Sequence, residues 1–289
     1  MVIMRTIIRF ITFVASSGIL MNYFFTMSEK KEVAVPKESP YFTGQPRKMT
    51  HFLDCKAIFN GDKNEIQKGI AVNEPFFHSD DKIMNIAKNC SALKRLGYIT
   101  KPVLKREEIF PIAFTILMYK DVAQVEFLLR TIYRPQNVYC IHVDKSATKA
   151  RRQMEDIVSC FQNVFIVSEP VTIIYAGFSR LQADINCMRD LNNHPVKWKY
   201  LINLSGQMFP LKSNEEMVRI LEIYNGANDI ELHGLGIMYR RRYKWKFAEV
   251  RNNSGHYIVN LSVPNAALPF GLEYVKGSAY GIFSRAFVR

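Results

Sequence analysis

Residues 111–144 read PIAFTILMYKDVAQVEFLLRTIYRPQNVYCIHVD and decide the fold, because their hydrophobic period changes from strand to helix and back to strand. The run Pro111–Tyr119 is short and mostly apolar, as in a strand that is buried on both faces. Asp121 then stands where a helix N-cap belongs, and apolar residues recur at helical spacing until Pro135. The next apolar run, Val138–Val143, predicts a second buried strand, so the stretch predicts one βαβ unit.

Asp144 lies at the carboxyl end of the second predicted strand. Ligands of open α/β sheets bind at this edge, so Asp144 is a candidate to accept hydrogen bonds from the base or ribose of a nucleotide. The alternative is that Asp144 caps the next helix, although Ser146 could supply that cap. The turn Leu117–Asp121 after the first strand contains no glycine, which disfavours a dinucleotide site of the NAD type.

The alternation of strands and helices continues beyond Asp144 and predicts an α/β protein with a doubly wound sheet. Asn214 is expected to cap a helix that ends before Gly226, with Glu215 and Glu216 in its first turn. The other predicted helices are Ser146–Phe161, Ser179–Leu191 and one that begins at Ser284. The other predicted strands are Val164–Val167, Lys199–Leu204, Asp229–Leu232, Tyr257–Asn260 and Ser278–Phe283.

The composition indicates a globular protein, since 48% of the 289 residues are hydrophobic and 12% are aromatic. A formal net charge of +13 would suit nucleic acid, an anionic membrane surface or a phosphate-bearing substrate. The sequence contains no zinc-finger spacing and no basic-region heptad, and its Phe and Tyr residues fall on buried periods. Nucleic acid is therefore not expected as a partner.

The amino terminus predicts a membrane anchor. Arg5 and Arg9 precede an uncharged run from Phe10 to Phe25, so residues 1–27 are expected to form a cytoplasmic tail and a signal-anchor helix. The rest of the chain would then be luminal, as in a single-pass type II membrane protein. The alternative is a cleaved signal peptide, because the small residues Ala15–Gly18 could be cut by a signal peptidase.

Two segments separate the expected anchor from the main domain. Residues 28–50 are polar, with no periodic apolar face, and predict an extended stem. Residues 51–109 show a weak helical pattern near Ile83 and predict a small N-terminal subdomain. The main α/β domain is expected to span residues 110–289.

The cysteines and sequons fit a secretory chain. The five cysteines follow no metal-binding spacing and are Cys55, Cys90, Cys140, Cys160 and Cys187. Spacing alone leaves open whether they form disulfides or are small buried side chains. The four Asn-x-Ser sequons begin at Asn89, Asn203, Asn252 and Asn260. Asn203 lies within a predicted buried strand and should stay unmodified, so Asn252 is the expected glycosylation site.

Six motifs carry a resemblance to one enzyme family. They are FPIAFTILMY, LLRTIYRPQNVYCIHVD, SCFQNVFIVSEP, YAGFSRLQADINCMRDL, WKYLINLSGQMFPLKSNEEMVRIL and KGSAYGIFSR. In this order, and nearly without gaps from Cys55 to Phe287, the chain resembles the core-2/I-branching β-1,6-N-acetylglucosaminyltransferases. The resemblance implies a GT-A-like, doubly wound Rossmann-type sheet. It also implies an inverting, metal-independent transfer of N-acetylglucosamine from UDP-GlcNAc to galactose or N-acetylgalactosamine of O-glycans at the Golgi membrane, without a cofactor.

The resemblance assigns two groups of binding residues. The positions that line the uridine-nucleotide site correspond to Leu117, Tyr119, Asp144 and Tyr175. The positions that bind acceptor sugars correspond to Glu231 and Arg242. Tyr119 replaces a histidine, and both tyrosines have a structural alternative, Tyr119 as a half-buried strand residue and Tyr175 as a core residue. The basic run 240–246 around Arg242 could equally be a solvated face.

The resemblance also implies the disulfides Cys90–Cys160 and Cys140–Cys187 and leaves Cys55 unpaired. The family partner of Cys55 lies beyond the matched stretch. So do the catalytic glutamate and the arginine and lysine that bind the diphosphate in the family. The chain is therefore expected to lack the C-terminal part of the fold, and no catalytic residue is assigned to it.

No metal is expected, because Asp144 is followed by Lys145 and Ser146 and not by the second acid of an Asp-x-Asp pair. The adjacent acids Asp80-Asp81 and Glu107-Glu108 are expected to be solvated surface. Met208 stands where the family has an aspartate, which puts the geometry of the donor or acceptor in question.

The leading hypothesis is a Golgi transferase with a UDP-sugar donor and a glycoprotein O-glycan acceptor as partners, held to the membrane by its anchor. Homodimerisation is left open, and the expected truncation puts the activity of this chain in doubt. One alternative is a non-catalytic luminal module that binds glycan or nucleotide. The other is a xylosyltransferase-like relative, since the chain shares the Gly206-Gln207 and Phe209-Pro210 pattern with that group.

Overall fold

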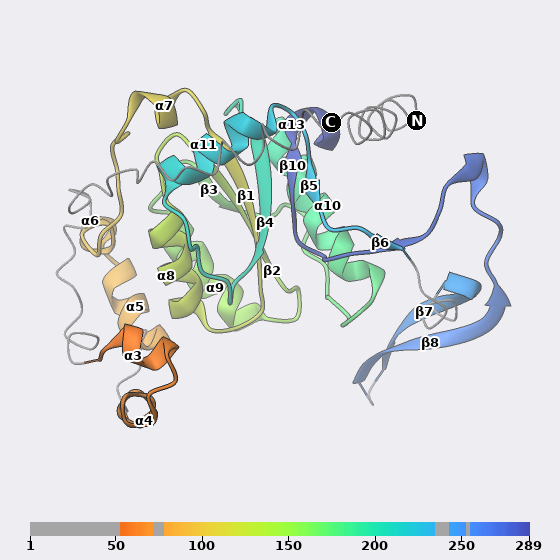
Figure 1. The fold of residues 1–289 in the computed structure, drawn as a ribbon, viewed down its shortest axis with the longest axis horizontal. Helices are drawn as coiled ribbons and strands as arrows, with labels where there is room; N and C mark the ends of the chain where they lie inside the picture. The colour runs from red at the N-terminus through yellow and green to blue at the C-terminus, as the bar shows by residue number, and fades with distance from the viewer. Residues whose placement is uncertain (1–52, 72–77, 235–242, 253–254) are drawn as a thin grey trace, which may run out of the picture. The chain divides into compact units, whose positions relative to one another are not determined.

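The structure is a computed structural model that describes residues 53–71, 78–234, 243–252 and 255–289 (Figure 1). The expected anchor, the stem and Arg242 lie outside the described residues. Within the described part of the chain, no helix is both long and apolar enough to cross a membrane.

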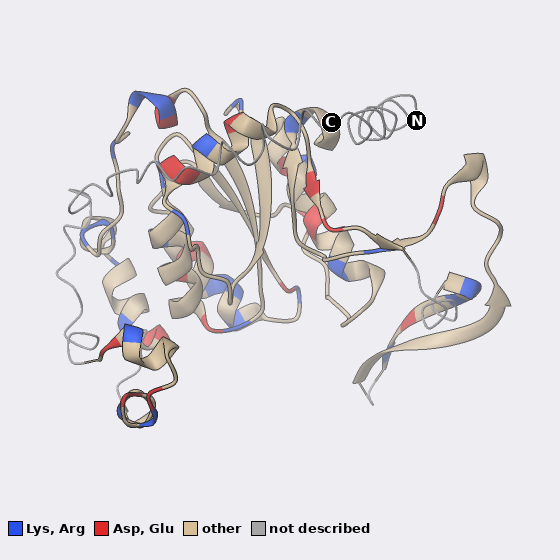
Figure 2. Ribbon diagram, in the orientation of Figure 1, with Lys and Arg blue, Asp and Glu red and all other residues tan. Residues whose placement is uncertain are grey.

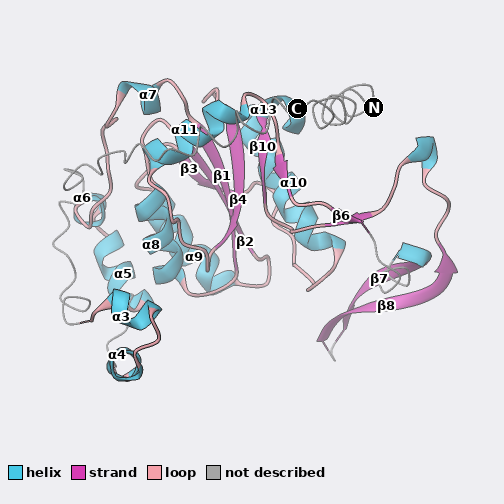
Figure 3. Ribbon diagram, viewed as in Figure 1, coloured by secondary structure: helices cyan, strands magenta, loops and turns pink. Residues whose placement is uncertain are grey.

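The centre of the protein is a six-stranded sheet with the strand order β3-β2-β1-β4-β10-β5 (Figure 3). Its strands are β1 (Ile112–Met118), β2 (Val138–Val143), β3 (Val164–Ile166), β4 (Tyr200–Ser205), β5 (Asp229–Ile230) and β10 (Gly281–Ser284). The first four strands run parallel, and β10 pairs antiparallel with both β4 and β5. The predicted βαβ unit is confirmed, and the sheet is a mainly parallel one.

Both faces of the sheet are covered, which explains why β1 and β2 are apolar at nearly every position. Ile112, Phe114 and Ile116 of β1 belong to one hydrophobic cluster, whereas Ala113 between them belongs to a second. The first cluster includes residues of the helices α8 (Val122–Ile132), α9 (Thr148–Val158) and α11 (Asn214–Tyr224). The second includes Cys187 and Leu191 of α10 (Phe178–Asn193). The four parallel strands carry no Lys, Arg, Asp or Glu, and Figure 2 shows the charged residues on the surrounding helices and loops.

Among the described residues, five short helices precede the sheet. They are α3 (Cys55–Phe59), α4 (Lys63–Ile70), α5 (Asp80–Ala87), α6 (Cys90–Lys94) and α7 (Lys105–Glu108). The weak helical pattern near Ile83 corresponds to α5, whose Ile83 and Ala87 are buried in the same cluster as the sheet. Leu93 of α6 lies in that cluster too. These helices therefore add to the core that holds the central strands.

Two helix starts differ from the expectation, and at a third the expected N-cap residue makes no capping bond. Ser213, and not Asn214, is the N-cap of α11, where it forms a capping box with Glu216. The helix predicted from Ser146 begins at Thr148, with Ala147 as its N-cap. Asp121 is the N-cap residue of α8 but has left-handed backbone angles and makes no capping hydrogen bond through its side chain. Asp80 Oδ1 instead accepts a hydrogen bond of 2.8 Å from the N–H of Ala123, so α5 caps α8 from outside.

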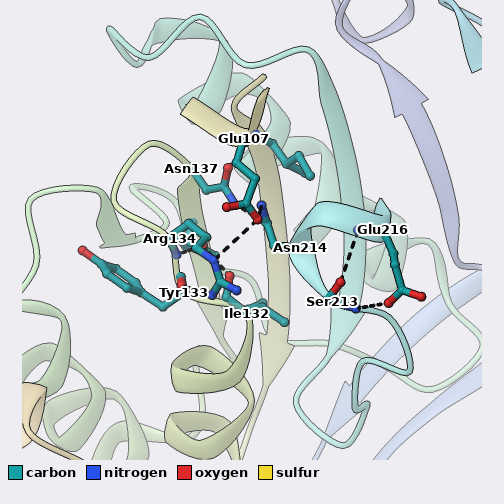
Figure 4. Close-up of polar contacts among 10 residues, drawn as sticks. Glu107, Ile132, Tyr133, Arg134, Asn137, Ser213, Asn214 and Glu216 are labelled. Carbon is teal, nitrogen blue, oxygen red and sulfur yellow. Dashed lines mark hydrogen bonds and ion pairs between the residues drawn. The ribbon is translucent and has the colours of Figure 1, made fainter. Parts of the chain in front are cut away.

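Glu107 is buried, which corrects its expected place on the solvated surface (Figure 4). Its Oε1 accepts a hydrogen bond of 2.8 Å from Asn214 Nδ2 and lies 3.9 Å from Arg134 Nε. Asn214 Oδ1 in turn accepts from Asn137 Nδ2, and Asn137 Oδ1 accepts from the N–H of Ile112. This network ties the first residues of β1 and α11 together at the edge where the parallel strands begin.

The segment after α11 forms two small additional sheets. β7 (Trp245–Asn252) pairs with β8 (Gly255–Pro264) in an antiparallel hairpin, and β6 (His233–Gly234) pairs with β9 (Val275–Lys276). β7 was not predicted, and its first two residues, Trp245 and Lys246, belong to the basic run 240–246 that could equally have been a solvated face. The chain ends in β10 and the short helix α13 (Arg285–Val288).

The two expected disulfides are present. Cys90 at the start of α6 is bonded to Cys160, and Cys140 of β2 is bonded to Cys187 of α10. Cys55 is free and exposed. Because Cys140 lies in the sheet and Cys187 lies in the helix that covers it, the second disulfide links two layers of the fold.

Candidate functional site

A pocket of about 490 Å³ lies at the carboxyl ends of β1, β2 and β4. The sheet places β2 on one side of β1 and β4 on the other, so this is the point at which the strand order reverses. Crevices at such points are where open α/β sheets bind ligands. The lining residues are Leu117, Met118, Tyr119, Lys120, Asp121, Gln124, Asp144, Ser146, Ala147, Ile173, Tyr175, Arg180, Ser205, Gly206 and Gln207.

All four residues expected to contact a nucleotide line this pocket: Leu117, Tyr119, Asp144 and Tyr175. The side chain of Tyr175 is 94% exposed, so its alternative as a core residue is wrong. Tyr119 is 59% exposed and follows the last residue of β1, with Lys120 Nζ 5.7 Å from its ring centroid. The structure thus presents two exposed aromatic rings and one buried carboxylate around a single cavity.

Asp144 is 6% exposed and makes its hydrogen bonds within the pocket wall. Its Oδ1 accepts from the N–H of Ser146 at 2.8 Å and from Ser146 Oγ at 2.6 Å. Its Oδ2 accepts from the N–H of Ile173 at 2.7 Å, which fixes the loop before α10 to the end of β2. Asp144 therefore does not cap α9. Each carboxylate oxygen offers about two acceptor directions, so Oδ2 retains capacity for a ligand donor.

A buried histidine supports the loop that carries Tyr175. His142 Nε2 accepts a hydrogen bond of 3.0 Å from the N–H of Val171, which requires a neutral ring with its proton on Nδ1. Burial lowers the pKa of His142, against the charges of Asp144 and Asp184, which raise it. The loop then turns at Ala176, where φ is 61°. A neutral His142 therefore belongs to the arrangement that presents Tyr175.

The structure adds residues that the sequence did not identify as part of the site. Arg180 from the first turn of α10 and Lys120 from the turn after β1 are the basic residues among those that line the pocket. Gly206 follows β4 and donates its N–H to the carbonyl of Leu117 at 2.8 Å. A Cβ at Gly206 would lie 2.7 Å from Val125 Cγ2, so only glycine permits this close approach. No local sequence pattern distinguishes Arg180 from an ordinary surface residue.

Glu231, one of the two expected acceptor residues, does not line this pocket. Glu231 is exposed, and its Oε1 lies 2.6 Å from His233 Nε2. Arg242 lies outside the described residues. Asn252, the expected glycosylation site, is exposed on β7, whereas Asn203 is buried in β4.

A larger pocket of about 920 Å³ lies between the start of α10 and the β7–β8 hairpin. Tyr175 lines both pockets. The charged side chains of the larger pocket bind backbone groups, since Glu249 Oε1 accepts from the N–H of Ser179 and Arg251 donates to the carbonyl of Thr172, both at 2.7 Å. These contacts attach the hairpin to the helix. The smaller pocket is the better candidate for a functional site, because it lies at the strand ends.

Among the described residues, no cluster of three or more His, Cys, Asp or Glu side chains could hold a metal ion.

The sheet is mainly parallel, is covered on both faces and has a pocket where its strand order reverses. These features define an α/β protein of the class that binds ligands at the carboxyl ends of its strands. Residues 112–289 match the family described as Branch: Core-2/I-Branching enzyme. The chain belongs to this family.

Curated relatives support the same assignment. A human β-1,3-galactosyl-O-glycosyl-glycoprotein β-1,6-N-acetylglucosaminyltransferase is 40% identical over 82% of this chain and 56% of its own length. The zebrafish (Danio rerio) enzyme of the same name, numbered 4, is 39% identical over the same shares. The chain thus spans about half the length of the curated relatives that it matches. Among solved structures, a 4-diphosphocytidyl-2C-methyl-D-erythritol synthase from Anaerococcus prevotii matches 64% of this chain and 74% of its own chain. The TM-score is 0.34 and the identity is 12%, so this similarity is too distant to support an argument.

Proposed function

We propose that this protein is a β-1,6-N-acetylglucosaminyltransferase of O-glycan biosynthesis and that its strand-end pocket binds the donor UDP-GlcNAc. The observation that carries the proposal is the convergence of Leu117, Tyr119, Asp144 and Tyr175 on one cavity. These residues come from two strand ends and a loop and are separated by up to about 60 positions in the sequence. A cavity of this size is suitable for a nucleotide sugar.

Each of these residues has a physical role in the proposed complex. Asp144 accepts a hydrogen bond from the uracil or ribose through the free capacity of Oδ2. Tyr175 offers an exposed ring on which the uracil stacks, an interaction that contributes about 1–3 kcal/mol per base. Leu117 and Tyr119 contribute to the wall of the pocket.

The remaining features belong to the same proposal. The fold is a GT-A-like, doubly wound Rossmann-type sheet, and the reaction is inverting and independent of metal. The acceptor is galactose or N-acetylgalactosamine of an O-glycan on a glycoprotein, with Glu231 and Arg242 as its binding residues. The protein is a type II Golgi membrane protein, with residues 1–27 as anchor and Asn252 as glycosylation site. The family membership and the name of the curated relatives support the transfer of N-acetylglucosamine to an O-glycan, and the other assignments rest on the sequence and the family resemblance.

The described pocket supplies donor recognition and no general base. Its carboxylates are Asp121 and Asp144. Asp121 lies 3.4 Å from Lys120 Nζ, and both oxygens of Asp144 accept hydrogen bonds from the protein. An inverting transfer needs a carboxylate that takes the proton of the attacking hydroxyl. We therefore expect residues 1–289 to bind the donor but to transfer sugar slowly.

The test is titration calorimetry of UDP and UDP-GlcNAc against the purified 289-residue chain in the presence of chelator. Tyr175→Ala should weaken UDP binding about tenfold through loss of stacking. The matched control is Phe270→Ala, because Phe270 is 95% exposed and lines no described pocket, and it should leave binding unchanged. Absence of UDP binding by the wild-type chain would refute the proposal.

A transfer assay with UDP-GlcNAc and a galactosyl-β-1,3-N-acetylgalactosamine acceptor checks the second expectation. Turnover comparable with that of the human relative would show that a carboxylate outside the described pocket acts as base, with Glu231 the first to be replaced.

A further inference from the structure

Arg180 is held in the wall of the strand-end pocket by a buried acid. Its Nη1 forms an ion pair with Asp184 Oδ2, one turn further along α10. Asp184 is 2% exposed and does not line the pocket, so it lies behind the guanidinium. This arrangement places the basic group toward the cavity and its counter-ion in the interior.

Asp184 is itself fixed by the two strands whose ends form the pocket. Its Oδ1 accepts a hydrogen bond of 3.0 Å from Thr115 Oγ1 of β1. Its Oδ2 accepts one of 3.1 Å from Asn203 Nδ2 of β4. Neighbouring residues in these parallel strands are paired in register, Thr115 opposite Asn203. The position of Arg180 is therefore set by the sheet and not only by its own helix.

The guanidinium keeps hydrogen-bonding capacity after this pairing. Arg180 Nη2 is buried and has no hydrogen-bond partner among the described residues, and the ring centroid of Tyr280 lies 5.4 Å from Cζ. The side chain is 23% exposed. Burial lowers the pKa of Arg180, but the charge and hydrogen bond of Asp184 and the Tyr280 hydroxyl outweigh it, so the pKa is raised. Arg180 remains a cation with donors to spare at every accessible pH.

The other basic residue of the pocket is less suited to hold an anion in one place. Lys120 Nζ lies 3.4 Å from Asp121 Oδ2, and its side chain is 54% exposed. A solvated lysine with its own acid adjacent contributes little fixed potential. An arginine whose planar group is fixed from behind is the better partner for phosphate oxygens, which it can contact with two parallel N–H donors.

We infer that Arg180 binds a phosphate group of the nucleotide sugar and that Asp184 is its positioning residue. The inference rests on the proposed function and divides the pocket into two parts. Asp144 and Tyr175 recognise the uridine, and Arg180 recognises the diphosphate. The ligand class for the second part is a nucleoside diphosphate, and uridine without phosphate does not engage it.

The experiment compares uridine and UDP as ligands of the full 289-residue chain by titration calorimetry with chelator present. In the wild type, UDP should bind more tightly than uridine, and the advantage should shrink as salt concentration rises. Arg180→Gln should weaken UDP binding about 10- to 100-fold and leave uridine binding within about twofold, because a charge-assisted phosphate contact is lost and the uridine contacts remain. Uridine binding also reports that the variant is folded.

The matched control is Arg189→Gln. Arg189 lies on the same helix, is paired with Glu169 at 2.9 Å on the surface and lines no described pocket. It should bind both ligands as the wild type does. Asp184→Asn, which preserves the shape of the side chain but removes the charge, should give a smaller loss for UDP and none for uridine.

The outcomes separate the two proposals. If the wild type binds UDP and Arg180→Gln binds it equally well, the phosphate role of Arg180 is wrong while the proposed function stands. If the wild type binds neither ligand, the proposed function fails and the inference fails with it. If Arg180→Gln does not fold, Arg180→Lys takes its place, because it keeps the charge without the planar guanidinium group. Its affinity for UDP alone should fall about three- to tenfold. Unchanged UDP binding by this variant would overturn the inference.

Discussion

Removal of the Cys140–Cys187 disulfide should destabilise the protein more than removal of Cys90–Cys160, although it closes the shorter loop. The sequence separations are 47 and 70 residues. In the chain-entropy model these loops correspond to about 4.0 and about 4.4 kcal/mol, so loop length alone favours Cys90–Cys160 by a few tenths of a kcal/mol. Burial reverses this order. Cys140 and Cys187 are both fully buried, whereas Cys90 is exposed.

Replacement of a buried cysteine by alanine leaves a small void, which costs about 1 kcal/mol for each sulfur removed from the core. The double variant Cys140→Ala/Cys187→Ala should therefore lose about 6 kcal/mol of unfolding free energy. The variant Cys90→Ala/Cys160→Ala should lose about 5 kcal/mol, since only Cys160 is buried.

The assay is urea unfolding followed by tryptophan fluorescence, with midpoints converted to free energy through a shared m-value. Trp198 is fully buried in the same cluster as Cys140 and Cys187 and reports on that region directly. An equal loss in the two variants, or a larger loss for Cys90–Cys160, would refute the argument from burial. A loss below about 2 kcal/mol in either variant would refute the entropy estimate as well.

Three further outcomes are expected. Burial lowers the pKa of His142 in the folded protein. Its contribution to the unfolding free energy should therefore be constant above pH about 6.5 and fall below it, by up to about 1.4 kcal/mol per pH unit. His142→Gln should flatten this fall when urea unfolding is measured at several pH values. Asp80→Ala should cost about 1 kcal/mol because it uncaps α8, whereas Asp81→Ala on the exposed side of α5 should be neutral in the same assay. Glycopeptide mapping of the folded protein from a secretory host should find Asn252 occupied and Asn203 unoccupied, and glycan on Asn203 would contradict the buried position of its side chain.

The elements that the sequence predicted well are those of the central sheet, because burial there sets the pattern of apolar residues along each strand. Val138–Val143 was predicted with the bounds that the structure shows, because every residue of this strand is buried. The hairpin strand β7 has exposed and half-buried residues in no simple alternation, so its sequence resembles a solvated basic segment. Periodicity carries information only where one or both faces of an element are buried.

The misplaced residues share a different cause. Glu107 was assigned to the surface because it is next to a second acid, Glu108, and its partner, Asn214, lies more than 100 positions away in the sequence. Arg180 has the sequence context of an ordinary surface residue, and only the contacts of Asp184 with two strands show its place in the pocket. Long-range polar contacts of this kind leave no local pattern, so the sequence and the family resemblance identified the four positions expected to contact a nucleotide but not the residues that support them.

In a secretory host, Asn203 must be buried before its sequon is glycosylated. β4 reaches its place beside β1 only after about 80 residues of intervening chain have been arranged, and such distant parallel pairing is a slow step. Until then the Asn203-Leu-Ser sequon is open to the glycosylation machinery. A glycan on this side chain, which finally donates to Asp184 and to the carbonyl of Ala279, would bar the strand from the sheet. In such a host, a chain in which Asn203 is glycosylated before β4 pairs with β1 should therefore not complete its central sheet.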